Sequence, residues 1–160
     1  APPYNLSQTW VSAIFLLYIL GSFSSTMAGS LAGKRGPRRT LWIFLLIFLA
    51  GIAITLLAPL AGVIVGMAVV TVGFFGAHSI ASAWVGRRAR ADRAQGSAFY
   101  LFFYYMGGSI LGSIGGFAWT HGGWPGVAAF TGGLIALAGL IGMRLARVLP
   151  LPPEKDSPAE

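Results

Sequence analysis

The stretch TLWIFLLIFLAGIAITLLA, residues 40–58, contains no charged side chain and only two hydroxyl groups. About 20 apolar residues in a helix, each rising about 1.5 Å, cross the roughly 30 Å hydrocarbon core of a bilayer. Further stretches of the same character lie at about residues 9–31, 61–85, 95–117 and 126–143. None shows the strict alternation of a barrel strand, and only a helix pairs its own backbone groups within hydrocarbon. We therefore predict an all-α membrane protein with five transmembrane helices in residues 1–149 and a disordered tail at 150–160.

The overall composition excludes an ordinary soluble domain. Hydrophobic residues make up 56% of the chain, charged residues make up 9%, and the mean hydropathy is +0.75. Soluble domains carry about 25% charged residues. The net charge of +7 would suggest nucleic acid in a soluble protein, but the basic residues stand in clusters beside apolar stretches, so we expect no nucleic-acid partner. There is no cysteine and no H-E-x-x-H or P-loop motif, and we expect no metal, no cofactor and no catalytic residue.

The basic clusters predict how the helices are oriented. They comprise Lys34, Arg35, Arg38 and Arg39, then Arg87, Arg88, Arg90 and Arg93, and finally Arg144 and Arg147. Residues 1–8, 58–60 and 120–125 contain no Lys or Arg. Because basic residues favour the cytoplasmic side, we place the start of the chain outside and its C-terminal tail in the cytoplasm. Residues 1–8 show neither a starting methionine nor a signal sequence, so we expect further sequence upstream.

A shift of 87 positions aligns the helix predicted at 9–31 with the one at 95–117. Identical residues then stand opposite one another at Gln8 and Gln95, Phe15 and Phe102, Tyr18 and Tyr105, Gly21 and Gly108, Ser22 and Ser109, and Gly29 and Gly116. The two helices would run in opposite directions, so the copies would be inverted. Inverted repeats are typical of secondary transporters, whose substrate site lies near the membrane midplane. The alternative is a shared bias toward glycine and aromatic residues.

His78 is the candidate functional residue of the helix at 61–85, because it is the one ionisable side chain deep in an apolar stretch. Such groups are costly in a membrane, and an imidazole can carry a proton near neutral pH. We predict that His78 lines a substrate cavity. The alternative is a neutral histidine bonded to a facing hydroxyl group. The predicted helices contain no Asp or Glu, so a proton-binding carboxylate would have to lie in another part of the transporter.

The helix at 95–117 has aromatic residues near its start and a row of glycines further on. We predict that Tyr100, Phe103, Tyr104 and Tyr105 wall the cavity, and that Gly108, Gly112 and Gly116 form a helix-packing row. Packing or lipid contact is the alternative for the aromatic residues.

The helix at 9–31 offers Tyr18, Ser22 and Ser25 on one face as further cavity residues. Their hydroxyl groups could instead bond backbone carbonyls. Helices 40–58 and 126–143 are nearly free of polar side chains, which predicts lipid-facing outer positions.

Two other classes of protein compete with a transporter. An intramembrane hydrolase needs an activated serine, and Gly21-Ser-Phe-Ser24 with His78 offers the nearest materials, but the G-x-S-G context is absent. A five-helix scaffold or assembly protein is the other alternative. We expect a protein that is not an enzyme.

Two loop motifs resemble those of a known family. The motif GSLAGKRGPRR, residues 29–39, resembles the cytoplasmic signature of the major facilitator superfamily, which follows the second helix of each six-helix half. Gly29, Gly36, Arg38 and Arg39 match it. The motif RADRAQG, residues 90–96, is similar to the start of the eleventh helix in bacterial efflux members, with Arg93 at the matching position. Gly33 stands where the family has Asp, and Pro37 where it is usually basic.

This resemblance covers nearly the whole chain and has several implications. The five helices would be the eighth to twelfth of twelve, in an inverted 3+3 half without its first helix. The most similar members are inner-membrane permeases of the arabinose-efflux and drug-efflux type. The resemblance thus implies alternating-access efflux of a drug-like or sugar-like small molecule in a bacterial inner membrane, as a proton-coupled antiporter. The expected partners are membrane lipid, the substrate, protons and the N-terminal half of the same transporter.

Overall fold

We describe the fold from a computed structural model, which covers residues 7–8, 12, 14–57, 59–89 and 92–145. Within these residues the chain is helical and has no strand. A 3-10 turn, η1 (Ile14–Leu17), leads into α2 (Tyr18–Arg35), α3 (Pro37–Thr55), α4 (Leu60–Arg88) and α5 (Arg93–Leu145). In this described part, four helices are long and apolar enough to cross a membrane. The chain is therefore an all-α membrane protein.

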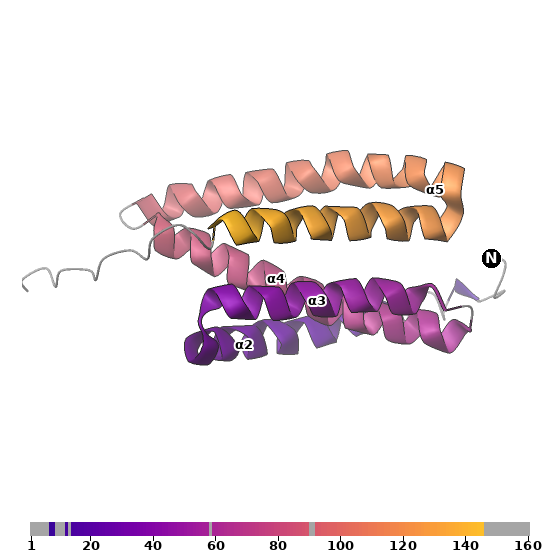
Figure 1. Cartoon of the computed structure of the whole chain (residues 1–160), viewed down its shortest axis with the longest axis horizontal. Helices are drawn as coiled ribbons and strands as arrows, with labels where there is room; N and C mark the ends of the chain where they lie inside the picture. Colours follow the sequence, from indigo (N-terminus) through magenta and orange to yellow (C-terminus); the bar gives the residue numbers. More distant parts are fainter. Residues whose placement is uncertain (1–6, 9–11, 13, 58, 90–91, 146–160) are drawn as a thin grey trace, which may run out of the picture.

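The long helix α5 folds back on itself as a hairpin (Figure 1). Gly123 interrupts the helical backbone with φ 56° and ψ −149°, and Pro125 follows two residues later. Such a backbone conformation is essentially reserved for glycine. The first leg, before Gly123, and the second leg, after it, are each long enough to pass the bilayer, so the described part of the chain makes five passes. We predicted a loop at 120–125, but the helix continues to the bend and reverses there.

The other helix ends also differ from the hydropathy prediction. In the described part α2 begins at Tyr18, and residues 9–11 and 13, in the first turns of the predicted helix, lie outside the described ones, as does the predicted tail at 150–160. At the basic turn, α2 continues to Arg35 and α3 begins at Pro37, which brings the two helices closer in sequence than predicted. Gly36 has φ 81° and reverses the chain. Basic side chains are favourable in the last turn of a helix, and proline is favourable at its first position. For this reason α2 and α3 both extend beyond the apolar stretches.

A seam of glycines brings α3 and α4 into close contact. A Cβ atom placed on Gly73 of α4 would overlap Phe48 of α3, and one placed on Gly76 would overlap Phe44. On α3, Gly51 lies against the backbone of Val70. Small residues of this kind let two helix backbones approach closely in a membrane. We call these contacts the α3–α4 glycine seam.

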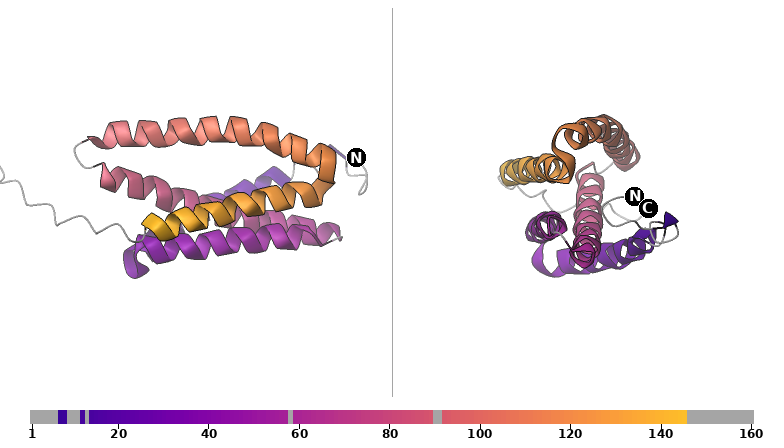
Figure 2. Two further views of the ribbon diagram at one scale, coloured as in Figure 1. Left: turned by 45° about the horizontal axis from the view of Figure 1, so that its top comes forward. Right: turned by 90° about the vertical axis from the view of Figure 1, so that its right-hand side faces the viewer.

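On its other flank, α4 packs against α2. Ser24 is 2% exposed, and its hydroxyl group donates to the backbone carbonyl of Val72 at 2.6 Å. A small core forms where α2, α3 and α4 meet, around Ala28, Phe44, Ala77 and Ile80. The α5 hairpin lies on the side of α4 away from α2 (Figure 2), and its second leg packs on α3 through Ile135 and Ile52.

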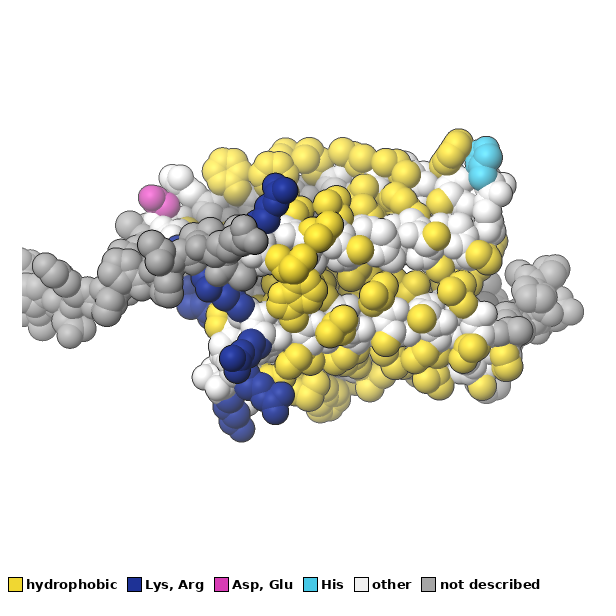
Figure 3. Space-filling model, in the orientation of Figure 1, with side chains coloured by type: hydrophobic (Ala, Val, Ile, Leu, Met, Phe, Trp, Pro, Cys, Tyr) yellow, Lys and Arg dark blue, Asp and Glu magenta, His cyan; other side chains and the backbone are white. Residues whose placement is uncertain are grey.

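The molecular surface has an apolar belt and one basic end. Large hydrophobic side chains are exposed along all the helices, and Figure 3 shows them between the two ends, with Lys and Arg gathered at one end. Such a continuous apolar surface suits hydrocarbon rather than water. In Figure 1, α2 and the first leg of α5 run in opposite directions, the relation that an inverted repeat requires.

Candidate functional site

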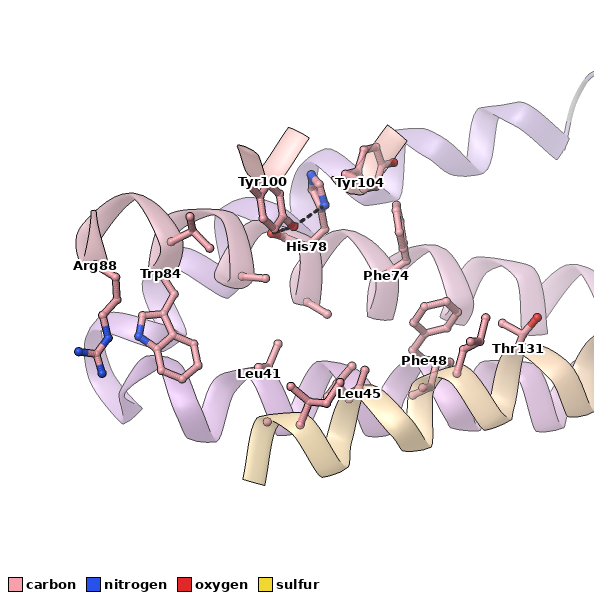
Figure 4. Close-up of a pocket in the computed structure, with 18 of the residues that line it drawn as sticks. Leu41, Leu45, Phe48, Phe74, His78, Trp84, Arg88, Tyr100, Tyr104 and Thr131 are labelled. Atoms are coloured by element: carbon pink, nitrogen blue, oxygen red, sulfur yellow. Dashed lines mark hydrogen bonds between the residues drawn. The ribbon is translucent and has the colours of Figure 1, made fainter. Parts of the chain in front are cut away.

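A cavity of about 920 Å³ lies between α3, α4 and both legs of α5 (Figure 4). Its lining includes Leu41, Leu45 and Phe48 from α3, Phe74, His78, Trp84 and Arg88 from α4, Tyr100 and Tyr104 from the first leg of α5, and Thr131, Leu134, Ile135 and Ile141 from the second. Its size falls in the range of about 300–1,000 Å³ that is usual for small-molecule sites.

The polar centre of the cavity is His78 with the hydroxyl group of Tyr100. The hydroxyl oxygen lies 3.0 Å from Nδ1 of His78, and the hydroxyl group also reaches the backbone carbonyl of His78 at 3.3 Å. Which of the two groups donates in the contact with Nδ1 depends on the histidine tautomer, because a protonated ring nitrogen donates and an unprotonated one accepts. His78 therefore contacts a facing hydroxyl group, as the alternative interpretation expects, and it also lines the cavity.

Aromatic rings enclose the imidazole from two helices. The ring of Phe74 lies stacked at 5.8 Å from that of His78, and the ring of Tyr104 lies at 4.7 Å, measured between centroids. Phe74 and His78 stand one helical turn apart on α4, and Tyr100 and Tyr104 one turn apart on α5. Residues four apart share a helix face, so two facing pairs build the cluster. We call these four residues the histidine cluster.

The remaining lining is almost entirely apolar. Thr131 adds a hydroxyl group, and Arg88 lies at the basic end of the cavity. No carboxylate of the described residues lines it, and the described chain contains no group of three possible metal ligands. This arrangement suits an uncharged or weakly polar small molecule that accepts or donates a hydrogen bond at the histidine cluster.

The predicted α2 residues lie elsewhere. Tyr18 and Ser22 are exposed, Tyr18 packs its ring on Phe75 at 5.7 Å, and the Ser25 hydroxyl group reaches the carbonyl of Phe75 at 3.5 Å. The physical reason is that α2 packs on the flank of α4 opposite to the α5 hairpin. The Ser24 and Ser25 hydroxyl groups donate to α4 carbonyls across helices, whereas the alternative for Ser25 was a carbonyl one turn back in its own helix.

Two of the predicted aromatic residues of α5 also lie away from the histidine cluster. Tyr105 is exposed. Phe103 lines a neighbouring hollow of about 630 Å³ between the two legs of α5, together with Gly108 and Gly112, and this hollow shares Tyr104 and Thr131 with the cavity. Tyr105 follows Tyr104 directly in the helix and therefore points in a different direction.

The predicted glycine row contacts no other helix closely within the described chain. No described atom lies within 4 Å of a Cβ placed on Gly108, Gly112 or Gly116. Gly108 and Gly112 therefore border the hollow between the two legs of α5 without close contact to the second leg.

The loop-motif residues gather at the basic end. Arg38 stacks over the Trp84 ring at 6.0 Å from its centroid, while Arg39 and Arg93 are exposed and Gly29 contacts nothing within 4 Å. Gly36 supplies the left-handed turn between α2 and α3.

Several cavity residues were not predicted from the sequence. Phe74, Trp84 and Arg88 share the His78 side of α4 at near-helical spacing, a signal that could have identified them. Helices α3 and the second leg of α5 were predicted to face lipid only, yet each presents one face to the cavity. Composition cannot distinguish these faces, because an apolar cavity wall and a lipid-facing surface use the same side chains.

Apolar helices long enough to cross a membrane, arranged around an open cavity, define a polytopic membrane protein. The profile of the Major Facilitator Superfamily matches residues 3–160, and the chain belongs to this superfamily. It is 41% identical over 97% of its length to an uncharacterized MFS-type transporter, YybF, of Bacillus subtilis, and 40% identical over 92% of its length to the inner membrane transport protein YnfM of Escherichia coli. An uncharacterized transporter of Buchnera aphidicola is 34% identical over 91% of the chain.

The chain spans only 38%, 35% and 35% of these three relatives, respectively. No solved structure matches it. The relatives are named as transporters, which agrees with the prediction that the chain is not an enzyme and gives no support to the hydrolase or scaffold alternatives. Ser24, the serine of the hydrolase alternative, is buried and bonded to a backbone carbonyl.

Proposed function

We propose that this chain is the C-terminal part, helices eight to twelve, of a secondary transporter that exports a small molecule by alternating access. The observation that carries the proposal is the cavity between α3, α4 and the α5 hairpin, with its polar groups concentrated at the histidine cluster. A site of this kind within a helix bundle binds a substrate through apolar contact and a few directed hydrogen bonds.

The lining favours a drug-like substrate over a sugar-like one. A sugar carries hydroxyl groups around its whole ring, and each one needs a partner when it leaves water. The cavity concentrates its polar groups at His78, Tyr100 and Tyr104, with Thr131 and Arg88 further away, and is otherwise hydrocarbon and aromatic. An aromatic or aliphatic molecule with one or two polar atoms fits this distribution.

Proton coupling would involve His78 together with a carboxylate elsewhere in the transporter. The four acidic residues of the chain, Asp92, Glu154, Asp156 and Glu160, all lie outside the helices that cross the membrane. His78 is the titratable group that this chain brings to the polar centre of the cavity, and its charge would change the affinity for a polar substrate atom. We infer a proton antiporter on this basis.

The site of action is the bacterial inner membrane, with the basic end of the bundle in the cytoplasm. This orientation follows from the gathering of Lys and Arg at one end (Figure 3). The printed name of the Escherichia coli relative, an inner membrane transport protein, agrees with that location. Gly116, which has no described atom within 4 Å of a placed Cβ, would allow close approach of the N-terminal half of the transporter.

The experiment is a transport assay on the full-length protein with His78→Ala and, as a matched control, His121→Ala. His121 is exposed near the Gly123 bend, far from the cavity lining. Export of a lipophilic dye and of arabinose is measured between pH 6 and 8 in vesicles that contain each variant. We expect the wild-type protein to export the dye. In His78→Ala the apparent affinity for the dye should weaken by about fivefold or more, because hydrogen bonds are lost. In His121→Ala it should not change. Unchanged affinity and pH dependence in His78→Ala would refute the assignment of the cavity.

A further inference from the structure

A further pocket of about 510 Å³ adjoins the cavity at the basic end of the bundle. Five arginines line it, namely Arg35, Arg38, Arg39, Arg87 and Arg88, together with Trp84. They come from the end of α2, the start of α3 and the end of α4, so three helix ends converge on one place. No carboxylate of the described chain lines this pocket. We call it the arginine pocket.

We propose that the arginine pocket binds the phosphodiester head group of an anionic phospholipid. Guanidinium groups from three helix ends concentrate positive charge here, and this concentration attracts an anionic phosphate group. Arginine presents planar pairs of N–H groups that match two phosphate oxygens at once, so several arginines around one pocket suit a phosphate better than a carboxylate or a halide.

The backbone beside the pocket adds to the attraction for an anion. Helix α3 begins here, with Pro37 in its first turn and no side chain capping its N-terminus. The start of a helix carries a partial positive charge and directs N–H groups outward. Gly36, at φ 81°, and Pro37 are themselves part of the lining. The helix start and the arginines thus favour the same kind of ligand.

The surroundings point to a lipid rather than to a free anion. Trp84 lines the arginine pocket and also the apolar cavity, and Arg88 does the same. Figure 4 shows both side chains at the basic end of the cavity, next to Leu41. The pocket therefore borders on hydrocarbon-lined space, and its tryptophan has the character of residues at the membrane interface. An amphiphile with an anionic head and an acyl chain matches both sides of this boundary, whereas a free phosphate ion matches only one.

The test uses the full-length protein, purified in a neutral detergent, and native mass spectrometry to measure bound lipid. The probes are phosphatidylglycerol, phosphatidylcholine and inorganic phosphate. The variant is Arg35→Gln with Arg39→Gln, and the matched control is Lys34→Gln, since Lys34 lies in the same turn, is exposed and does not line the pocket. Circular dichroism confirms that each variant retains its helices, and Arg35→Lys with Arg39→Lys preserves the charge if the glutamine variant is unstable.

We expect phosphatidylglycerol to bind well above phosphatidylcholine, and the glutamine variant to bind it about fivefold more weakly for each arginine removed. The Lys34→Gln control retains wild-type binding, and the lysine variant retains more than the glutamine variant. Equal binding of the two lipids would overturn the proposal. Full displacement of phosphatidylglycerol by inorganic phosphate at the same concentration would also overturn it, because the pocket would then be a site for free anions. An equal loss of lipid binding in the Lys34→Gln control would overturn it as well.

Discussion

The indole nitrogen of Trp124 donates a hydrogen bond to Thr55, 3.1 Å from its backbone carbonyl and 3.2 Å from its hydroxyl oxygen. Thr55 is buried at the end of α3, and Trp124 stands directly after the Gly123 bend. The hydrogen bond therefore fastens the bend of the α5 hairpin to the end of α3, at the end of the bundle opposite to the arginine pocket.

Replacing Trp124 by Phe keeps an aromatic ring and removes the donor. We expect the free energy of unfolding in detergent to fall by about 1 kcal/mol, because hydrogen bonds between membrane helices have about this value. Unfolding in mixed micelles with increasing SDS measures it. Trp119→Phe, at an exposed site on the same hairpin, is the control and should leave stability unchanged; an equal loss there would contradict the role of the Thr55 contact.

The Gly123 bend makes a second prediction. An alanine at φ 56° and ψ −149° is strained by about 1–3 kcal/mol, so Gly123→Ala should lower the melting temperature of the purified protein. Gly122→Ala serves as the neighbouring control, since Gly122 is helical and a Cβ there meets no described atom within 4 Å. If the two variants have the same melting temperature, the bend does not depend on the conformational freedom of glycine.

The α3–α4 glycine seam should be intolerant of any side chain. A Cβ on Gly73 meets the backbone of Phe48, which cannot rotate away, so Gly73→Ala is expected to cost about 1–3 kcal/mol through overpacking. Gly112→Ala, with no described atom within 4 Å, is the matched control for helix propensity. Detergent unfolding of both variants compares the two sites, and a stable Gly73→Ala protein would argue against the seam.

The histidine cluster can be tested with one oxygen atom. Tyr100→Phe removes the hydroxyl group beside His78 and keeps the ring, so we expect a threefold to tenfold rise in the apparent KM for the transported dye, consistent with a loss of about 1 kcal/mol. Tyr104→Phe leaves the ring contact with His78 in place and should change the KM less. A larger rise in KM for Tyr104→Phe than for Tyr100→Phe would show that the hydroxyl group of Tyr104, and not that of Tyr100, binds the substrate.

The orientation can be measured with single cysteines, because the chain contains none of its own. Lys34→Cys at the basic end and His121→Cys near the bend both occupy exposed positions. In intact cells, a membrane-impermeant maleimide should label position 121 and spare position 34 until the membrane is opened. Labelling of both positions from one side would contradict the orientation.

The membrane passes could be predicted from the sequence because hydrocarbon imposes a length and a polarity on every helix that crosses it. Helix ends could not, since α2 continues through Lys34 and Arg35, and the turn at Gly123 looks like an ordinary loop in the sequence. Basic residues stand in the last turn of α2, α4 and α5, but hydropathy alone ends each predicted helix at its last apolar residue.

Part of the candidate site could be predicted in the same way. His78, Tyr100 and Tyr104 stand out as polar groups in apolar stretches, and the structure brings them together. Tyr18 and Ser22 have the same polarity but lie on a helix that packs against the other flank of α4. Which flank a neighbouring helix occupies depends on tertiary packing, such as the Ser24 contact with Val72, and the pattern within one helix does not contain it.

The glycine seam also has a mechanical consequence. At Gly51 and Gly73 the two backbones touch directly, without side chains between them that could change rotamer and allow sliding, so we expect α3 and α4 to move as one rigid unit. The α5 hairpin is attached to this unit near both ends, through Tyr100 beside His78 and through Trp124 bonded to Thr55. We therefore expect changes in cavity volume to come mainly from bending of the first leg between these two attachments, where Gly108 and Gly112 have no close neighbour within the described residues.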